Sequence, residues 1–413
     1  MRSSTGRWVI GDDFFNREDE LAMFESQVRN GNHLLVAGQR RMGKTSILQE
    51  LGRRLKADGW SFLFVDIEGA TCPEDVIADL ARALHPERSV LVQVASAMKQ
   101  WFDDNVEELS AAEFGVRFRA ALNEGSWRRH GDSLLDHCAS EGRPALLVID
   151  ELPIFLTRLL HRDGNADRVD GFLSWLRGAV QKRGGTGPVL IVSGSIGLEP
   201  LVRRLRLSDR INHLYSVRVG PWNREASAAC FEQLAAAYNL GLEPGVADAV
   251  YDAIGIGIPH HVQSFFARLR DYAAMRNLSR IALKDVQHVY KSELLGPPGQ
   301  NDLVHYETRL RAALTDEEHG LAMEILAEAA VEGVFGEPSR RSLSRLYSTV
   351  LGNAPQIVAE TLDVLVHDGY LVPAANGHRF DSRLLQDWWS ARFRDHHVPL
   401  TKRGARRQGG AER

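Results

Sequence analysis

The residues from Gly38 to Thr45 read GQRRMGKT and fit the pattern G-x-x-x-x-G-K-[ST]. Gly38 and Gly43 can adopt backbone angles closed to other residues, so several N–H groups can point into one concavity that holds an anion. The pattern predicts that Lys44 reaches the β- and γ-phosphates of a nucleotide and that the Thr45 hydroxyl binds Mg²⁺. The other expected nucleotide-binding residues in this stretch are Gln39, Arg40, Arg41, Met42 and Ser46.

A second acidic group is needed to hold the metal, and PALLVIDEL supplies it. Asp150 follows a continuous apolar run, Ala145 to Ile149, and is the expected Mg²⁺ partner. Glu151 comes next and could polarise an attacking water. A buried strand with an acidic end is common by itself. Together with the phosphate loop, however, the Asp-Glu pair favours hydrolysis over simple binding.

These groups need strands and helices to position them. Apolar runs predict four buried strands, at 33–37, 62–67, 145–149 and 189–192, and helical spacing of apolar residues follows Lys44. We therefore expect an α/β fold, a three-layer P-loop core with a parallel sheet. Residues 71 to 142 contain helical patches and predict a helical insertion. An elaborated crossover is preferred there over a dedicated binding module.

Several further segments carry a family resemblance. In chain order they are NREDEL, GQRRMGKTSIL, VDIEG, LLVIDELPIFL, IVSGSIG, GIPHHVQ and HRFDSRLLQDWWSARF. Together they resemble the archaeal-type ATPase family, a branch of the STAND class of AAA+-related P-loop ATPases that also occurs in bacteria. We find no signature of ABC or RecA-like ATPases. Asn16 stands where the family has a glycine, in the motif that contains Arg17.

The resemblance implies roles for four more residues. Arg17 would lie near the adenine, and Pro259, in the Gly-x-Pro motif, would lie against the bound nucleotide. Ser193 would sense the γ-phosphate, with Ser195 as second choice, although a serine-rich turn is the alternative. Arg210 would reach a neighbouring subunit's nucleotide as an arginine finger, and a solvated basic surface is the alternative there.

The remaining chain divides by its pattern. The predicted domains are a core at 1–222, a helical lid with a connector at 223–300, a winged-helix domain at 301–395 and a basic, disordered tail at 396–413. Gly296-Pro297-Pro298-Gly299 is expected to break the chain before the last domain. His260 and His261 are adjacent on a helix and point about 100° apart, so a metal site is rejected. Trp388 and Trp389 are interpreted as core anchors.

Composition narrows the functional classes. The 413 residues are 44% hydrophobic and 25% charged, with net charge −4 and three scattered cysteines. These values are ordinary for a soluble protein of two to four domains. No apolar stretch approaches the roughly 20 residues that span a bilayer, and the first residues lack the apolar core of a signal peptide. We expect a cytoplasmic protein.

The expected function is Mg²⁺-dependent ATP binding and hydrolysis. Under the first hypothesis, which depends on the resemblance, the protein is a nucleotide-controlled switch that contacts protein partners or its own copies, in bacterial defence or signalling. The alternative is a DNA-acting ATPase of the initiator or transposition-regulator kind, and a scaffold with negligible turnover is a third possibility. The third helix of the winged helix offers few phosphate ligands. Its exposed candidates are Gln356, Glu360, Asp363 and His367, while basic residues lie elsewhere, at Arg340, Arg341, Arg345, Lys402, Arg403, Arg406 and Arg407.

Overall fold

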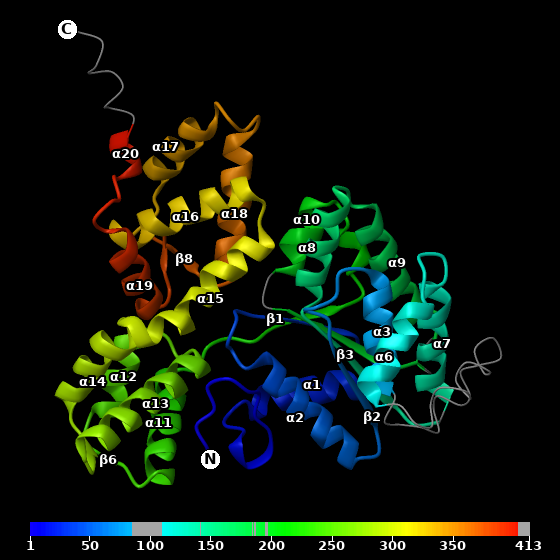
Figure 1. Cartoon of the computed structure of the whole chain (residues 1–413), viewed down its shortest axis with the longest axis horizontal. Helices are drawn as coiled ribbons and strands as arrows, with labels where there is room; N and C mark the ends of the chain where they lie inside the picture. Colours follow the sequence, from blue (N-terminus) through cyan, green and yellow to red (C-terminus); the bar gives the residue numbers. More distant parts are fainter. Residues whose placement is uncertain (85–109, 141, 184, 186, 195–196, 404–413) are drawn as a thin grey trace. The chain divides into compact units, whose positions relative to one another are not determined.

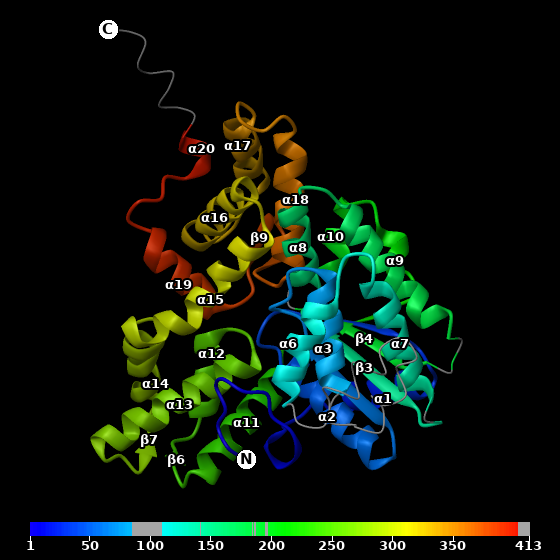
Figure 2. The same ribbon diagram turned by 45° about the vertical axis from the view of Figure 1, so that its right-hand side comes forward.

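The computed structural model describes residues 1–84, 110–140, 142–183, 185, 187–194 and 197–403 (Figures 1 and 2). The chain forms two compact units. The core unit consists of residues 8–37 and 44–219, and the C-terminal unit consists of residues 1–7, 38–43 and 220–413. The following paragraphs treat each unit by itself.

The core unit is built on a five-stranded parallel sheet with strand order β2-β3-β4-β1-β5. Every residue of β3 is buried, as expected for a parallel strand covered on both faces. The carboxyl ends of the strands share one edge, so Asp66 of β2 lies in register with Asp150 of β3. The strands are β1 (Leu34–Ala37), β2 (Ser61–Asp66), β3 (Ala145–Asp150), β4 (Val189–Ser193) and β5 (Tyr215–Arg218).

Helices cover both faces of this sheet. One face packs with the helices of the expected insertion and with the helices that follow β3 and β4 in a single apolar core. Helices α1 and α2 lie on the opposite side of the sheet (Figure 1). The three-layer α/β fold is therefore confirmed. The helices are α1 (Glu18–Arg29), α2 (Lys44–Ala57), α3 (Pro73–Leu84), α6 (Ala111–Ala121), α7 (Trp127–Ser140), α8 (Leu152–Asp163), α9 (Asp167–Gln181) and α10 (Leu198–Arg204), with short helices η1 (Gly11–Asp13) and η2 (Ser208–Arg210).

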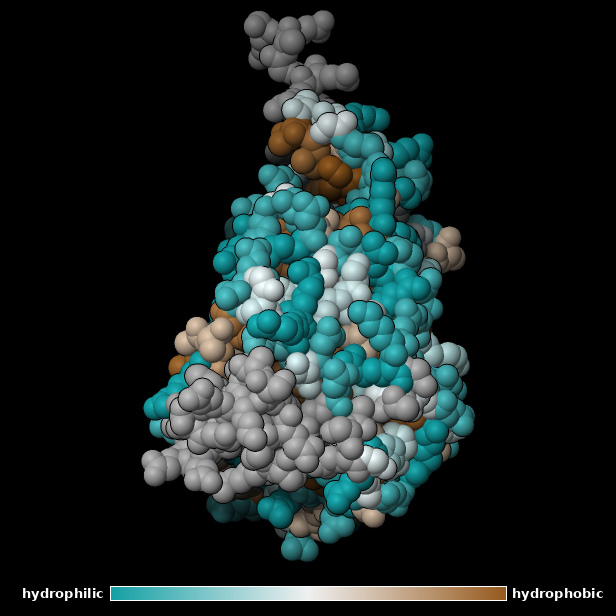
Figure 3. All heavy atoms as spheres, turned by 90° about the vertical axis from the view of Figure 1, so that its right-hand side faces the viewer, coloured by the Kyte–Doolittle hydropathy of each residue, from teal (hydrophilic) through white to brown (hydrophobic). Residues whose placement is uncertain are grey.

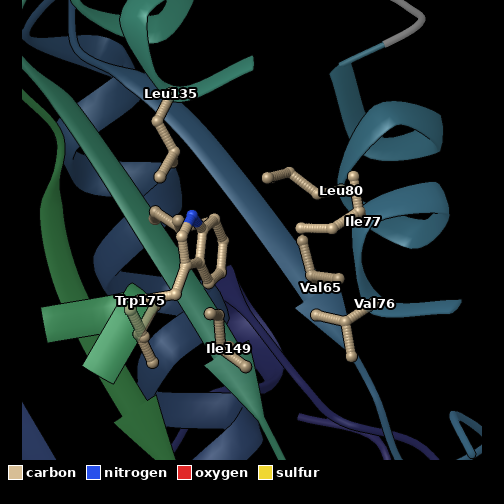
Figure 4. Close-up of a pocket in the computed structure, with 9 residues that line it drawn as sticks. Val65, Val76, Ile77, Leu80, Leu135, Ile149 and Trp175 are labelled. Atoms are coloured by element: carbon tan, nitrogen blue, oxygen red, sulfur yellow. The ribbon is translucent and has the colours of Figure 1, made fainter. Parts of the chain in front are cut away.

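The described helices of the insertion, α3, α6 and α7, share the apolar core of the sheet. An apolar cavity of about 10 Å³, about enough for one water molecule, remains between β2, β3, α3, α7 and α9. The indole of Trp175 and the side chains of Val76, Ile77 and Leu80 line it (Figure 4). These three helices therefore pack as part of the main core, and the choice of an elaborated crossover over a binding module stays a prediction.

The C-terminal unit begins with a helical segment. Its elements are α11 (Arg224–Ala237), β6 (Gly241–Leu242), α12 (Val246–Ile254), α13 (Pro259–Arg276), β7 (Arg280–Ile281), α14 (Leu283–Val289) and the π-helix η3 (Tyr290–Leu294). Pro259 occupies the first turn of α13, where a missing N–H costs nothing. A side chain at Gly257 would collide with the carbonyl of Trp222 and the hydroxyl of Ser227. This close approach explains why glycine precedes the proline.

The stretch from 278 to about 304 is predicted to be a connector, and the structure shows that most of it is helical, in α14, η3 and the start of α15 (Pro297–Ala313). Pro297 and Pro298 open α15, since proline is well suited to the first turn of a helix. The Gly-Pro-Pro-Gly breaker thus ends one helix and starts the next.

The last part of the chain has three helices followed by an antiparallel hairpin, which is the expected order. The tight turn is Ala375-Asn376, because Gly377 already pairs with Ala374. Trp388 and Trp389 are fully buried, which confirms them as core residues. The elements are α16 (Asp316–Val331), α17 (Glu337–Tyr347), α18 (Ala354–His367), β8 (Leu371–Ala374), β9 (Gly377–Phe380), α19 (Arg383–Phe393) and α20 (Leu400–Arg403).

The surface of this last part carries exposed apolar residues. Leu346 and Val350, at the corner between α17 and α18, are 40% and 75% exposed. Figure 3 shows hydrophobic surface on the C-terminal unit, at the top of the view, above a mainly hydrophilic face. Within the described residues, no helix combines the length and the apolar character needed to cross a membrane.

Candidate functional site

The core unit brings Lys44 and Thr45 at the start of α2 together with Asp150 at the end of β3. The Thr45 hydroxyl donates a hydrogen bond of 2.9 Å to Asp150 Oδ2. Lys44 is 7% exposed, and its positive charge acts on the Asp150 carboxylate. The structure therefore places the two expected metal-binding oxygens beside the expected phosphate-binding ammonium.

Asp150 is a buried carboxylate held by several donors. Its Oδ1 accepts hydrogen bonds from the Ser193 hydroxyl and from the backbone N–H of Glu151, the latter at 3.0 Å. Burial raises the pKa of Asp150 and the neighbouring Glu151 raises it further, whereas Ser193, Lys44 and Thr45 act in the opposite direction. Carboxylate and hydroxyl oxygens are the hard ligands that Mg²⁺ prefers, so the residues present fit this ion.

Glu151 has an unusual backbone conformation. With φ of 61° it lies in the left-handed region and forms the N-cap of α8. Such a conformation costs a non-glycine residue about 1–2 kcal/mol and is often found at functional sites. The conformation fixes the direction in which the Glu151 side chain leaves the sheet edge.

The phosphate loop has the backbone that its glycines permit. Gly38 and Gly43 have φ of 152° and 86°, both unfavourable for residues with a side chain. Arg41 also has positive φ, 70°. Gln39 and Met42 are buried, while Arg40 and Arg41 are partly exposed.

The C-terminal unit, to which this loop belongs, contains a half-buried histidine, His260, on which the charges of both arginines act. Burial lowers the pKa of His260 well below its usual value, and the positive charges of Arg41 and Arg40 lower it further. Pro259 precedes this histidine at the start of α13.

The N-terminal segment of the core unit contacts α2. The backbone N–H of Val9 donates to the Ser46 hydroxyl at 3.1 Å, and that of Gly11 donates to Glu50 at 2.9 Å. Ser46 therefore supports this segment. Arg17 is 6% exposed, caps α1 with φ of 83° and pairs with Glu20 at 2.6 Å.

Arg210 lies in η2 and is engaged within its own chain. Its guanidinium contacts Asp170 at 2.5 Å and Asp209 at 2.7 Å. These ion pairs are solvent-exposed, so they are weak enough to exchange for another anion. Its role as a finger stays a prediction. Ser195 lies outside the described residues.

Sequence reasoning gave no role to Asp66, which ends β2 in register with Asp150. Burial raises the pKa of Asp66, and the negative charges of Asp150 and Glu151 add to this effect. The available clue was the acidic end of the second strand in the segment VDIEG. Among the described residues, no group of three or more His, Cys, Asp or Glu side chains is arranged to hold a metal.

Comparison with known proteins finds a family match to part of the chain. Residues 28–202 match a family model described as an AAA domain. This AAA domain contains the phosphate loop, Asp150, Glu151 and Ser193, and the match supports a P-loop ATPase related to the AAA+ proteins. No curated protein matches the chain.

Solved structures show the fold of the whole chain. A Walker-type ATPase of Pyrococcus abyssi is 16% identical, with 94% of this chain and 99% of that chain covered and a TM-score of 0.60. Two other matches have lower TM-scores and add nothing to the argument. The Aeropyrum pernix ORC1 protein in complex with DNA is 16% identical (TM-score 0.46, 92% and 94% covered), and the Thermotoga maritima RuvB Holliday junction branch migration motor is 14% identical (TM-score 0.44, 94% and 97% covered).

Proposed function

We propose that the AAA domain binds Mg-ATP and hydrolyses it, with Lys44, Thr45, Asp150, Glu151 and Ser193 as the acting residues. One observation carries the proposal. Thr45 and Asp150 are 105 positions apart in sequence, yet they share a 2.9 Å hydrogen bond beside the buried Lys44. A turn with a chance glycine pattern would not place a buried acidic strand end at this position.

The mechanism follows from these groups. The Lys44 ammonium would offset negative charge on the β- and γ-phosphates. Bound Mg²⁺, held by Thr45 and Asp150, would supply further charge neutralisation between the phosphates. Glu151 accepts a proton from the attacking water and orients it. Ser193 donates to Oδ1 of Asp150, which orients that carboxyl and acts to lower its pKa against the effect of burial.

The proposed role is a nucleotide-controlled switch that contacts a protein partner or another copy of the chain. The exposed Leu346 and Val350 support protein contact, since exposed apolar groups often mark interaction sites. On α18, Gln356 and Asp363 are exposed and Gln356 is hydrogen-bonded to Glu360. An acidic third helix is poorly suited to DNA phosphates, so the DNA-acting alternative is less well supported.

Two substitutions test the chemistry. Lys44→Ala should abolish ATP binding in calorimetry, whereas Glu151→Gln should bind ATP normally and release no phosphate. Lys56→Ala, on the exposed end of the same helix, is the control and should keep both ATP binding and phosphate release. Normal ATP affinity in Lys44→Ala would remove the loop from the proposal. Normal turnover in Glu151→Gln would require another base.

A mass measurement tests the switch. The particle mass of the full chain should differ between ADP and a slowly hydrolysed ATP analogue, and duplex DNA should not change it. A turnover stimulated by duplex DNA with steep salt dependence would instead favour the DNA-acting alternative. The same mass in both nucleotides, with or without a partner, would contradict the switch.

A further inference from the structure

A charged pocket lies in the core unit, and its lining comes from the starts of α3 and α9, the end of α8 and the link between α6 and α7. Its volume is about 250 Å³, slightly below the usual range for small-molecule sites of roughly 300–1,000 Å³. The chemistry-bearing residues that line it are Glu74, Arg119, Asn123, Glu124, Arg162 and Arg168. None of them belongs to the proposed ATP site.

The arginines of this pocket differ in how many hydrogen bonds and ion pairs they already make. Arg119 is committed, because its Nε lies 2.5 Å from Asp75 and its Nη2 lies 3.1 Å from the Cys72 sulfur. Arg162 makes a single contact of 3.4 Å, to the backbone carbonyl of Thr71, among the described residues. A charge-assisted hydrogen bond is normally about 2.7–2.9 Å long. The donors of Arg162 are therefore available to a ligand.

Arg168 lies among three carboxylates and makes only long contacts with them, including hydrogen bonds of 3.5 and 3.4 Å from its Nη1 to the two oxygens of Asp163. Its distances to Asp163, Glu74 and Glu124 are 3.4, 3.6 and 3.7 Å within the described part of the chain. A guanidinium can make bidentate bonds to a planar oxyanion, and the present contacts use little of that capacity. Arg162 and Arg168 together can thus bind one carboxylate.

Two glutamates, Glu74 and Glu124, form the acidic side of the pocket. Glu74 is 5% exposed, so its carboxylate is held away from bulk water. Burial raises the pKa of the Cys72 thiol, and its hydrogen bond to Glu74 raises it further. The thiol therefore stays protonated and has no nucleophilic role here. Glu124 is mostly exposed and can turn toward a bound cation.

We propose that this pocket binds a small zwitterion of the amino-acid type. Its carboxylate would bind Arg162 and Arg168, and its ammonium would bind Glu74 and Glu124. With Arg119 paired to Asp75, the other charged lining groups are two arginines and two glutamates, and Arg168 contacts the two glutamates only at 3.6 and 3.7 Å. Replacing these long ion pairs on both sides takes a ligand with both charges, which neither a pure anion nor a pure cation has. A ligand with both charges does so within the available volume.

The position of Arg162 links the pocket to ATP hydrolysis, and this link rests on the proposed function. Arg162 lies in the last turn of α8, and Glu151 is the N-cap of the same helix. Twelve helical residues span about 18 Å, and a packed helix moves largely as a rigid body. Ligand binding at Arg162 would thereby alter the position of Glu151 and change the turnover rate.

The test uses the full chain without nucleotide, so that binding is read independently of ATPase activity. Calorimetry and thermal shift are recorded with glycine, L-glutamate and L-arginine as zwitterions, succinate and inorganic phosphate as anions, and putrescine as a dication. At least one of the three zwitterions should bind at 10 mM or below and more tightly than succinate, phosphate or putrescine. Only a zwitterion offers a carboxylate to the arginines and an ammonium to the glutamates. No binding by the three zwitterions, or equal binding of succinate, phosphate or putrescine, would overturn the proposal.

Substitutions then locate the binding. Arg162→Gln should weaken zwitterion binding at least about tenfold, since it removes charge-assisted hydrogen bonds to the ligand carboxylate. Arg162→Lys keeps the charge without the planar fork and should rescue only part of the affinity. Arg129→Gln, an exposed arginine of α7 outside the pocket, is the control. Unchanged affinity in Arg162→Gln would place the ligand elsewhere.

Turnover is measured last. The zwitterion should change ATP turnover in the unaltered chain and leave it unchanged in Arg162→Gln. Binding without any change in turnover would overturn the α8 link and leave the pocket assignment intact. A chain without ATPase activity would contradict the proposed function, and the binding arms would still decide the pocket.

Discussion

Replacing Ser193 with alanine perturbs the site at one atom. The Ser193 hydroxyl donates to Oδ1 of Asp150, and both residues are almost fully buried. Leaving a buried acceptor without a donor costs about 1–3 kcal/mol, but the Glu151 N–H continues to donate to the same oxygen. We therefore expect Ser193→Ala to lower the free energy of unfolding of the core unit by about 1–2 kcal/mol.

The same substitution should change the pH dependence of ATP turnover. The Ser193 hydrogen bond lowers the pKa of Asp150 and so opposes burial, which raises it. Without that bond the pKa rises further and Asp150 needs a higher pH to ionise. The acid limb of the turnover profile should therefore move to higher pH, which a series of phosphate-release assays between pH 5 and 8 would show.

Ser174→Ala is the matched control. Its hydroxyl also donates to an aspartate, Asp170, at 3.3 Å, but that carboxylate is 37% exposed and water can replace the serine. We expect a stability change within about 0.5 kcal/mol and an unchanged profile. If Ser193→Ala resembled Ser174→Ala in both measurements, the hydrogen bond to Asp150 would have no role in the site.

Three more substitutions have defined outcomes. Burial lowers the pKa of His213 to about 4, so the stability that the neutral imidazole contributes is complete above pH 6.5 and is lost as pH falls toward 4. In urea titrations, His213→Phe should therefore lose about 1 kcal/mol less unfolding free energy than the unaltered chain between pH 7.5 and 5. An equal loss in both proteins would refute this. Gly131→Ala should destabilise by about 1–3 kcal/mol, since its Cβ would meet the Trp175 ring and lie 2.9 Å from Ile77, whereas Gly178→Ala, with nothing within 4 Å, should not destabilise the chain in thermal unfolding. Arg210→Ala should lose ATP turnover, and turnover should return when this variant is mixed with Glu151→Gln. One variant then supplies Glu151 and the other supplies Arg210 at a shared site between subunits. No recovery of phosphate release in the mixture would exclude a finger acting between subunits.

The sequence predicted the core well because its determinants are local. Four of the five strands of the core sheet were placed within about one residue, since continuous apolar runs bounded by charged or glycine residues mark buried parallel strands. The bounds of β5 were not predicted, because only one of its four residues is buried and it lacks such a run. The loop and Asp150 were found because their spacing relative to strand ends is fixed by the chemistry of phosphate binding. The structure then placed Thr45 and Asp150 2.9 Å apart, as that chemistry requires.

Other features could not be predicted from local patterns. Gly296-Pro297-Pro298-Gly299 indicated a connector, although proline is equally suited to open a helix, and the structure shows α15 there. The charged pocket depends on segments around Glu74, Asn123 and Arg162, which only helix packing brings together. No spacing rule links such distant positions.

Positive φ angles occur in this chain both at asparagines and at residues that tolerate them poorly, Arg206 with φ of 59° among the latter. Asn239 and Asn277 have φ of 53° and 55°, but asparagine tolerates the left-handed region and Asn277 ends α13 in the usual way. Arg41 and Glu151 have φ of 70° and 61° without that tolerance, at a cost of about 1–2 kcal/mol each. Glycine at either position would remove the cost, so a requirement for the side chain must outweigh it. For Glu151 that requirement is the proposed contact with water, and for Arg41 it is a positive charge carried by the phosphate loop itself.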